Sequence, residues 1–257
     1  MQTTVQNSMD IGLAGQIADL ANSTVLAYAN NSKKLDRVTV SADDTTTTVT
    51  INGTAFTFTE TGAAENKAYI ADALVTLINA GSEPVTVYYT ALNEYFDIES
   101  NVAGTTTTVV GTASCVVTAR IGNAAAIGFG LLVVQDEMDD DKASVPILTT
   151  DISTAGKALG VTVMTQAIEQ NYQTAGGNGY ALETAMSIMR KGRIYVTVED
   201  AVTAGAQAFA RFDNSGGGSL GAFRSDDDSS TAVALPTGYY RTNTAASGIA
   251  ILEINLP

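Results

Sequence analysis

Residues 45–60 alternate polar and apolar positions on both sides of an Asn52-Gly53 pair. This pair is the strongest short signal for a β-hairpin, because both central residues of a type I′ turn need a positive φ. A two-residue loop there fixes the cross-strand pairs: Ile51 with Thr54, and Val49 with Phe56. In that register the apolar side chains share one face: Val49, Ile51, Phe56 and Phe58. The pattern therefore predicts two paired strands with one buried face.

The residues after this hairpin change to a helical period. Between residues 64 and 81 the apolar positions recur at helical spacing, at Ile70, Leu74, Leu77 and Ile78. Gly81 stands where a C-terminal cap belongs. Short strands are then expected at 84–89, 93–100, 105–110 and 114–119, with Val85, Val87 and Tyr89 on one face of the first. This order predicts a small α+β layer whose helix covers one face of a sheet.

The remainder of the chain returns to glycine-punctuated β patterns. Strands are expected at 126–136, 158–168, 192–200, 206–212 and 248–257. Their length and spacing are typical of a β-sandwich or a β-barrel. Residues 180–190 fit a short helix and a strand equally well. Ile249 to Leu252 are all apolar, which indicates a strand covered on both sides, by its own core or by a partner.

These patterns divide the 257 residues into three regions. Residues 1–36 are expected to form an arm with one strand near Thr24–Ala29, residues 37–120 a separate α+β unit, and residues 121–257 a β-rich unit. The chain is 45% hydrophobic, with 23 glycines and long threonine runs. We therefore predict a mainly β protein with a sandwich-like or barrel-like part.

Charge narrows the classes of partner. The chain has 13 basic and 27 acidic residues, for a net charge of −14. Such a surface is repelled by phosphate, which argues against nucleic acid as a partner. The one basic cluster is Arg190, Lys191 and Arg193, which predicts a solvated strand edge or a site that pairs with acids. The longest apolar run, residues 124–134, is too short to cross a membrane, and residues 1–15 lack the pattern of a signal peptide.

Candidate chemistry is sparse. The absence of histidine excludes Ser-His-Asp and Cys-His nucleophiles and metal sites built on imidazole. Residues 217–221 match the G-x-S-x-G string, but a nucleophile elbow needs a strand-to-helix turn and a histidine base, so a loop between strands is expected. Residues 153–159 and the glycines at 176–180 do not make a phosphate loop. The single cysteine, Cys115, is expected to be a buried strand thiol.

Two acidic runs and two tyrosine pairs remain. Residues 136–141 and 226–228 offer carboxylates of the kind that calcium prefers, but neither has the spacing of a calcium-binding loop, and solvated loop charge is the simpler interpretation. A structural cation at 136–141 stays open. The pairs at 88–89 and 239–240 could stack on sugars, although tyrosines on strands more often make half-buried cross-strand contacts. We predict no catalytic residue, no cofactor-binding residue, no metal ligand and no cofactor.

Several segments resemble, in order, the structural cement (decoration) proteins of tailed bacteriophages. They are "GQIADL" at 15–20, "IGFGLLVVQD" at 127–136, "LGVTVMTQAIEQ" at 159–170, "MRKGRIYVTVEDAVTAGAQAFARF" at 189–212, "GAFRSDDDSSTAVALPTGYYRT" at 221–242 and "AILEINLP" at 250–257. The block at 190–212 is the most specific. The middle region departs from the simplest form of the family and resembles an inserted domain.

The resemblance implies a bacteriophage virion protein that binds the outer surface of the capsid, cements the shell of major capsid protein, and is made in the host cytoplasm. It further implies a homotrimer, with residues 1–36 and 121–257 forming the capsid-binding domain and residues 37–120 inserted. No residue-level site comes with it, and no enzymatic activity, nucleic-acid partner or membrane partner is expected. The alternative is a virion surface protein that binds host carbohydrate or another receptor through the inserted domain.

Overall fold

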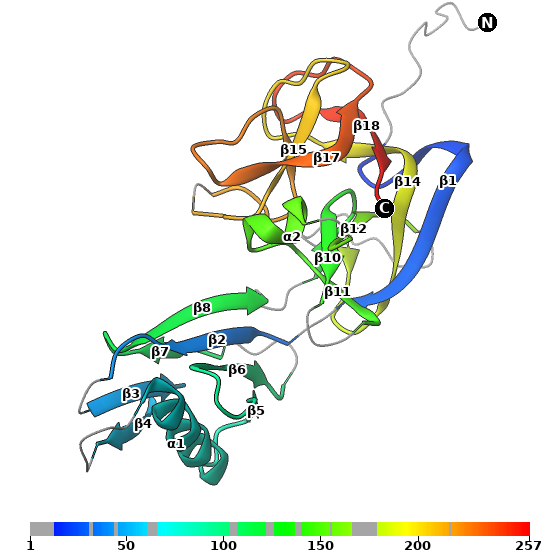
Figure 1. Ribbon diagram of the computed structural model, residues 1–257. Helices are drawn as coiled ribbons and strands as arrows, with labels where there is room; N and C mark the ends of the chain where they lie inside the picture. Colours follow the sequence, from blue (N-terminus) through cyan, green and yellow to red (C-terminus); the bar gives the residue numbers. More distant parts are fainter. Residues whose placement is uncertain are drawn as a thin grey trace, which may run out of the picture.

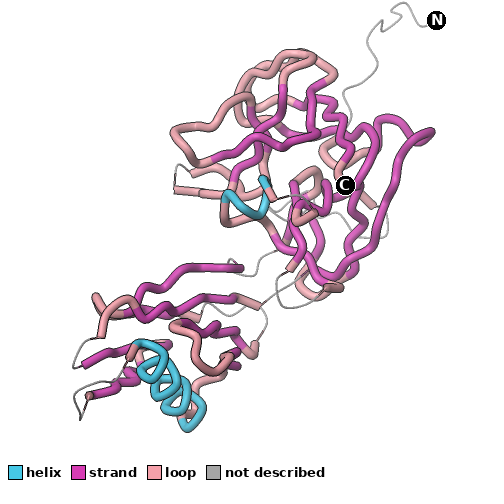
Figure 2. Tube along the Cα trace, viewed as in Figure 1, coloured by secondary structure: helices cyan, strands magenta, loops and turns pink. Residues whose placement is uncertain are grey.

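The computed structural model describes residues 13–30, 33–43, 46–60, 66–102, 107–121, 126–136, 140–154, 156–165, 179–215 and 217–257. These ranges are mainly β, as predicted, and Figures 1 and 2 show one group of strands around β14 and another around α1. Residues 1–12 of the predicted arm lie outside the described residues, and its expected strand near Thr24–Ala29 lies within the longer strand β1 (Ile17–Asn30). In the described part, no helix is long and apolar enough to span a membrane.

Five strands close into a barrel by hydrogen bonding in the order β1-β11-β10-β12-β14, with β14 pairing back to β1. Four further strands extend the sheet from β14 in the order β18-β17-β15-β16. The barrel strands are β1 (Ile17–Asn30), β10 (Leu132–Gln135), β11 (Lys142–Ser144), β12 (Ala158–Thr162) and β14 (Ala185–Thr197). The extension consists of β15 (Gln207–Arg211), β16 (Phe223–Arg224), β17 (Ala232–Tyr240) and β18 (Ile249–Asn255). Segments far apart in the sequence thus share one sheet.

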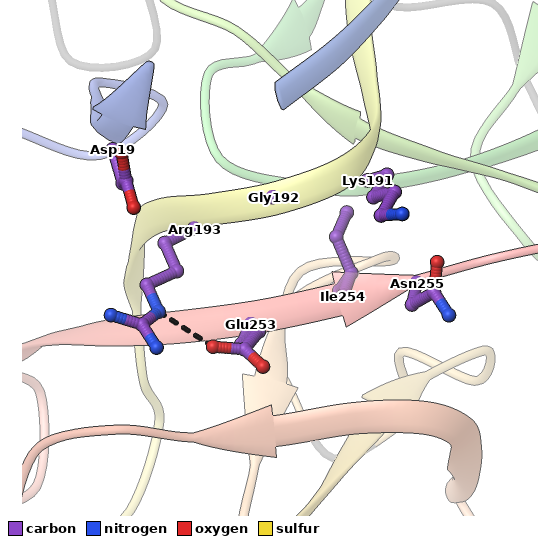
Figure 3. Close-up of a pocket in the computed structure, with 7 residues that line it drawn as sticks. All are labelled: Asp19, Lys191, Gly192, Arg193, Glu253, Ile254 and Asn255. Carbon is purple, nitrogen blue, oxygen red and sulfur yellow. Dashed lines mark hydrogen bonds and ion pairs between the residues drawn. The ribbon is translucent and has the colours of Figure 1, made fainter. Parts of the chain in front are cut away.

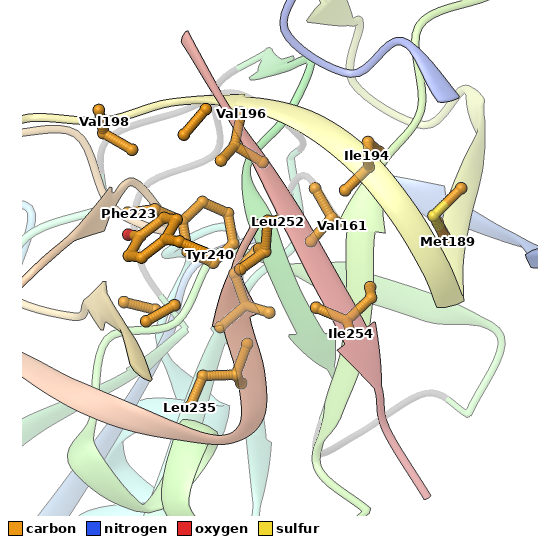
Figure 4. Close-up of a cluster of buried hydrophobic side chains, with 14 of the residues drawn as sticks. Val161, Met189, Ile194, Val196, Val198, Phe223, Leu235, Tyr240, Leu252 and Ile254 are labelled. Carbon is orange, nitrogen blue, oxygen red and sulfur yellow. The ribbon is translucent and has the colours of Figure 1, made fainter. Parts of the chain in front are cut away.

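Alternation along β14 and β18 places the main core beneath this sheet. Ile194, Val196 and Val198 point inward from the β14 side, and Ala250, Leu252 and Ile254 do so from β18. Figure 4 shows these side chains meeting Leu235, Tyr240 and Phe223, with Val198 and Phe223 at one end of the cluster and Met189 at the other. A second cluster, which includes Phe129, Leu159, Tyr180 and Ile188, packs near the short pair β9 (Ile127–Gly128) and β13 (Gly179–Tyr180). A short helix, α2 (Thr149–Ser153), lies near β17.

The strands between Leu35 and Ile121 pair with one another in two sheets, ordered β5-β6-β2-β8 and β4-β3-β7. Their bounds are β2 (Leu35–Val40), β3 (Thr46–Ile51), β4 (Thr54–Thr59), β5 (Val85–Tyr88), β6 (Tyr95–Ser100), β7 (Val109–Gly111) and β8 (Cys115–Ile121). The predicted hairpin is confirmed, with Ile51 opposite Thr54 and Val49 opposite Phe56. Asn52 and Gly53 both have positive φ. The register predicted from the turn is therefore the observed one.

The predicted helix is also present, as α1 (Lys67–Ala80), and its apolar side faces the core of this unit. Asn66 caps its N-terminus by accepting a hydrogen bond from the backbone N–H of Tyr69 at 3.0 Å. One detail of the prediction is wrong: Leu77 is exposed, because the buried side follows Ile70, Ala71, Leu74, Val75 and Ile78 instead. Gly81 is the C-terminal cap, as predicted; its backbone is extended, and a Cβ there would press on Phe56.

Three expected strands differ from the pattern. Residues 126–136 form two strands, β9 and β10, because a turn with Gly130 at positive φ interrupts them. Residues 185–190 of the ambiguous stretch join the next predicted strand to make the long β14, whereas Tyr180 belongs to β13. The last strand, β18, alternates: Ala250, Leu252 and Ile254 are buried, whereas its other apolar side chains are only half-buried. The chain's own core therefore covers only one face of β18, and cover of the other face by a partner stays a prediction.

Candidate contact surfaces of the barrel

The outward face of β14, β18 and β17 combines basic, aromatic and aliphatic side chains. Strand register places them on the side opposite the main core: Lys191, Arg193 and Tyr195 on β14, Ile251, Glu253 and Asn255 on β18, and Tyr239 and Arg241 at the end of β17. We call this set the basic face. Arginine and tyrosine are the residue types most enriched at protein–protein contacts, whereas isolated exposed apolar residues are ordinary. The composition therefore favours a contact surface.

Glu253 holds two guanidinium groups in place at the centre of the basic face. Its carboxylate accepts hydrogen bonds from Arg193 Nε at 2.5 Å and from Arg241 Nη2 at 2.7 Å and Nε at 3.1 Å. Hydrogen bonds from Arg241 and then Arg193 lower the pKa of Glu253 to about 2. Arg193 lies on β14 and Arg241 directly follows β17, so they are 60 and 12 positions away from Glu253 in the sequence. The bridge orders two long side chains before any partner arrives.

Beside this bridge lies a cavity of about 290 Å³, lined by Asp19, Lys191, Gly192, Arg193, Glu253, Ile254 and Asn255. Figure 3 shows Lys191 and Asn255 on one side of it, and Arg193 with Glu253 on the other. The cavity lies where β1 shifts register against β14, so that the four residues between Asp19 and Thr24 lie opposite Gly192 alone. Gly192 has φ +130°, and a Cβ there would come within 3.1 Å of the Ser23 Cα. Glycine therefore allows the close approach of the two strands at the bulge.

The predicted basic cluster is only partly one site. Lys191 and Arg193 are exposed on the basic face, whereas Arg190 is half-buried. The third cation of the face is Arg241, which lies 48 positions beyond Arg193 in the chain and is brought there by the β17–β18 pairing. The cluster was predicted to be either solvated or paired with acids, and each applies to one residue. Lys191 is exposed to solvent, and Arg193 pairs with the carboxylate of Glu253.

A second charged group lies where β14, β15 and β16 end. Arg211, 3% exposed, donates from Nε and Nη2 to Glu199 at 2.7–3.0 Å and from Nη2 to Asp228 at 2.5 Å. Arg224, also buried, reaches Asp226 at 2.8 Å, Asp228 at 2.9 Å and Glu199 at 3.2 Å. The hydrogen bond to Glu199 raises the pKa of Arg211, and the bond from Arg211 lowers the pKa of Asp228. This is the arginine network.

The network corrects the prediction for residues 226–228. Asp226 and Asp228 are not simply solvated loop charges, because each pairs with an arginine that is buried at the base of the loop. Asp227 is exposed. With Glu199 and Asp200, these three aspartates form what we call the acidic patch, in which four carboxylates pair with two guanidinium groups and Asp227 adds a fifth negative charge. The patch therefore presents net negative charge outward.

The G-x-S-x-G string lies against the arginine network and has no catalytic geometry. Residues 217–221 connect β15 with β16, which pair antiparallel, so the string is a loop between strands as predicted. A Cβ at Gly218 would overlap the side chains of Arg211 and Glu199. Glycine is thus needed there for packing onto the network.

The tyrosine pairs divide between core and surface. Tyr240 is fully buried and donates to the Arg224 carbonyl at 2.9 Å, whereas Tyr239 is 40% exposed on the basic face. In the unit of residues 35–121, Tyr88 is 40% exposed and Tyr95 is 37% exposed, and register places both on the outward face of the sheet β5-β6-β2-β8. Arg37 lies 4.3 Å from the centre of the Tyr95 ring. We call this the tyrosine face.

Polar groups on the tyrosine face are already paired. Arg37 donates to both carboxylate oxygens of Asp97, at 2.7 and 2.8 Å. The Tyr88 hydroxyl donates to Glu99 at 2.8 Å, and this bond raises the pKa of Tyr88 to about 12.

The other candidates add no site. Cys115 is buried, as predicted, and burial raises the pKa of its thiol to about 11. Residues 137–139 of the first acidic run and most of the glycine cluster at 176–180 lie outside the described residues. Among the residues that the structure does describe, no group of three or more acidic or cysteine side chains is placed to hold a metal ion.

Comparisons with known proteins give one family and a weak structural likeness. The model of a family described as "Structural cement protein (E217 gp24/Pam3 gp6)" matches residues 90–255. The match begins inside the region that we predicted to be an insertion. A chain in the solved structure titled "The capsid of Myoviridae Phage XM1" is 15% identical over 51% of this chain and 76% of that chain, with a TM-score of 0.38. No curated protein sequence matches.

Proposed function

Because the chain belongs to the family of phage structural cement proteins, we propose that it binds the outer surface of the phage capsid and stabilises the shell of major capsid protein. The family match over residues 90–255 is the observation that carries this proposal. It includes β14, β15, β17 and β18, and therefore both the basic face and the acidic patch. The protein acts by holding neighbouring subunits together and has no catalytic role.

The proposed mechanism uses many modest contacts rather than one strong site. Contacts repeated by symmetry over a shell give avidity, because each further contact forms at high effective concentration. We propose that the chain works as a homotrimer, with residues 1–36 and 121–257 as the capsid-binding domain and residues 37–120 as an inserted domain. The pairing of β2 to β8 only with one another in the described sheets supports the separate unit.

Attachment to heads tests this function. Expanded heads that lack the protein are mixed with the purified chain, separated by sedimentation, and assayed for bound protein and for resistance to heat. We expect saturable binding at symmetry-related positions and a higher temperature of head disruption. Heads that neither retain the protein nor gain stability would show that the proposal is wrong.

A second candidate function is supported by the tyrosine face. Exposed aromatic rings beside charged groups are typical of surfaces that stack on sugars, and Tyr88 and Tyr95 lie diagonally across β5 and β6. In this alternative the unit of residues 37–120 binds host carbohydrate or another receptor from the virion surface. A glycan array distinguishes the two, because only this alternative expects binding that is lost in a Tyr88→Ala, Tyr95→Ala double variant.

A further inference from the structure

The basic face is an outward sheet face with the composition of a contact surface. It carries three cations, Lys191, Arg193 and Arg241, against the carboxylates of Glu253 and Asp19. Half-buried Tyr195 and Ile251 and exposed Tyr239 supply apolar area between the charges. In a chain of net charge −14, this local excess of cations is where an acidic surface can approach with least repulsion.

The acidic patch lies at the other end of the same unit. Along β14 and its continuation, Arg193 and Glu199 are six residues apart, or roughly 20 Å of extended chain. That separation exceeds the screening length of about 8 Å at physiological salt, so the two charged surfaces do not neutralise each other. In Figure 4, Val198, which precedes Glu199, lies at one end of the core, and Ile194, which follows Arg193, lies toward the other end.

We propose that the basic face of one copy of this chain binds the acidic patch of the next copy. The proposal rests on the homotrimer proposed above and names the surfaces that would build it. Two different surfaces at opposite ends of one unit make a head-to-tail contact, and such contacts close into a ring when the rotation between copies allows it. The second copy is the partner whose complementary charge is present in this same sequence.

The details of each surface fit this pairing. Glu253 fixes Arg193 and Arg241 on the receiving side, and the arginine network fixes the loop that presents Asp227 on the other side. Both sides are therefore ordered in advance, which reduces the entropy lost on association. Lys191, exposed at the cavity, and Asp227, exposed on the patch, are charges that can be changed without removing those internal bridges.

A charge exchange tests the contact. Lys191→Glu and Asp227→Lys are made singly and together, and the association of each chain is measured by sedimentation velocity at low and high salt. Each single reversal should weaken association roughly tenfold or more, because it places like charges opposite each other. The double variant should recover most of the wild-type association. Lys67→Glu, on α1, is the matched control with the same change in charge and should associate like the wild type.

Thermal melting of every variant establishes that it is folded, and attachment to heads is measured in parallel. A wild type that stays monomeric overturns the inference but leaves the proposed function intact if it still binds heads. An oligomer that survives both reversals also overturns it, and if Lys191→Glu then fails to bind heads, the basic face belongs to the shell contact instead. Association that follows the charge exchange in a protein that binds no heads supports this inference and refutes the proposed function.

Discussion

Replacing Arg211 with methionine tests whether the arginine network holds the barrel extension together. Arg211 is 3% exposed, and its guanidinium donates to Glu199, Asp228, the Asp213 carbonyl and Thr231. Methionine keeps much of the side-chain volume but removes every one of these bonds. Glu199 and Asp228, the carboxylates that Arg211 neutralises, would then have only Arg224 as a cationic partner.

The magnitude follows from burial. Breaking a buried ion pair by removing one partner typically costs about 3–5 kcal/mol. The carboxylate partners are partly exposed, at 20% for Glu199 and 38% for Asp228, and Glu199 keeps Arg224 at 3.2 Å. We therefore expect the lower end, about 3 kcal/mol, which for a unit of this size corresponds to a melting temperature lower by roughly 6–12 °C. The melting temperature of Arg211→Lys should lie between those of the wild type and Arg211→Met, because lysine keeps the positive charge but not the planar guanidinium group.

Scanning calorimetry and urea unfolding measure this loss, and Arg241→Met is the matched control. Arg241 is 43% exposed, and Arg193 still pairs with Glu253 when Arg241 is removed, so the control should lose much less stability than Arg211→Met. Equal losses in the two variants, or a loss below about 1 kcal/mol for Arg211→Met, would show that the network contributes no more than surface ion pairs do.

Three further outcomes are expected. Gly160→Ala should lower the free energy of unfolding by more than about 2 kcal/mol in a urea titration, because a Cβ would overlap the Met189 carbonyl and φ is +154°. Gly53→Ala is the control: Gly53 has φ +89° but lies in open space, so this variant should lose only about 1 kcal/mol. The pKa of Glu253 is about 2, below its ordinary value, so its bridge stabilises the fold fully above pH 4.5, and that stability is lost as pH falls through 2. Since the site is partly exposed, Glu253→Gln should cost about 1 kcal/mol at neutral pH and nothing well below pH 2. Cys115, buried and with a pKa near 11, should react with a thiol reagent only as fast as its unit opens, and immediate labelling of the native protein would contradict this.

Local rules predicted the unit of residues 35–121 well, because its elements are specified by near neighbours in sequence. The turn at Asn52-Gly53 fixes its own register, and the helix carries its own cap at Asn66. The error at Leu77 depends on which side of the helix meets the sheet, and that is a tertiary property. Helical spacing defines an apolar stripe only to within about one residue on either side.

The barrel could be predicted as a class but not as a topology. Its closure depends on β1 pairing with β14, more than 150 positions away, across a bulge at Gly192. No pattern within either segment shows that pairing. The turn that divides 126–136 was missed for a similar reason, since Gly130 packs against Gly15, which is remote in sequence.

The charged surfaces show the same limit. The basic cluster at 190–193 was visible in the sequence, but Glu253 and Arg241 join it only through strand pairing. The buried partners of the run 226–228 could not be predicted from the sequence. Arg211 is remote from the run in the chain, and Arg224 is close to it but is buried on β16. The family resemblance, by contrast, used the order of whole segments, and the family match over residues 90–255 confirms it.

The absence of histidine and the position of the two charged surfaces support one account of how this chain works. Without histidine, the G-x-S-x-G loop has no base, and the structure uses that loop to pack on Arg211 instead. The carboxylates that elsewhere suggest catalysis or a cation here neutralise buried arginines or face outward. Since β18 leaves one side half-covered, beside ordered arginines, the sheet has an unused face of the kind that a neighbouring chain covers. These ordered surfaces of opposite charge are what the proposed contact between copies requires.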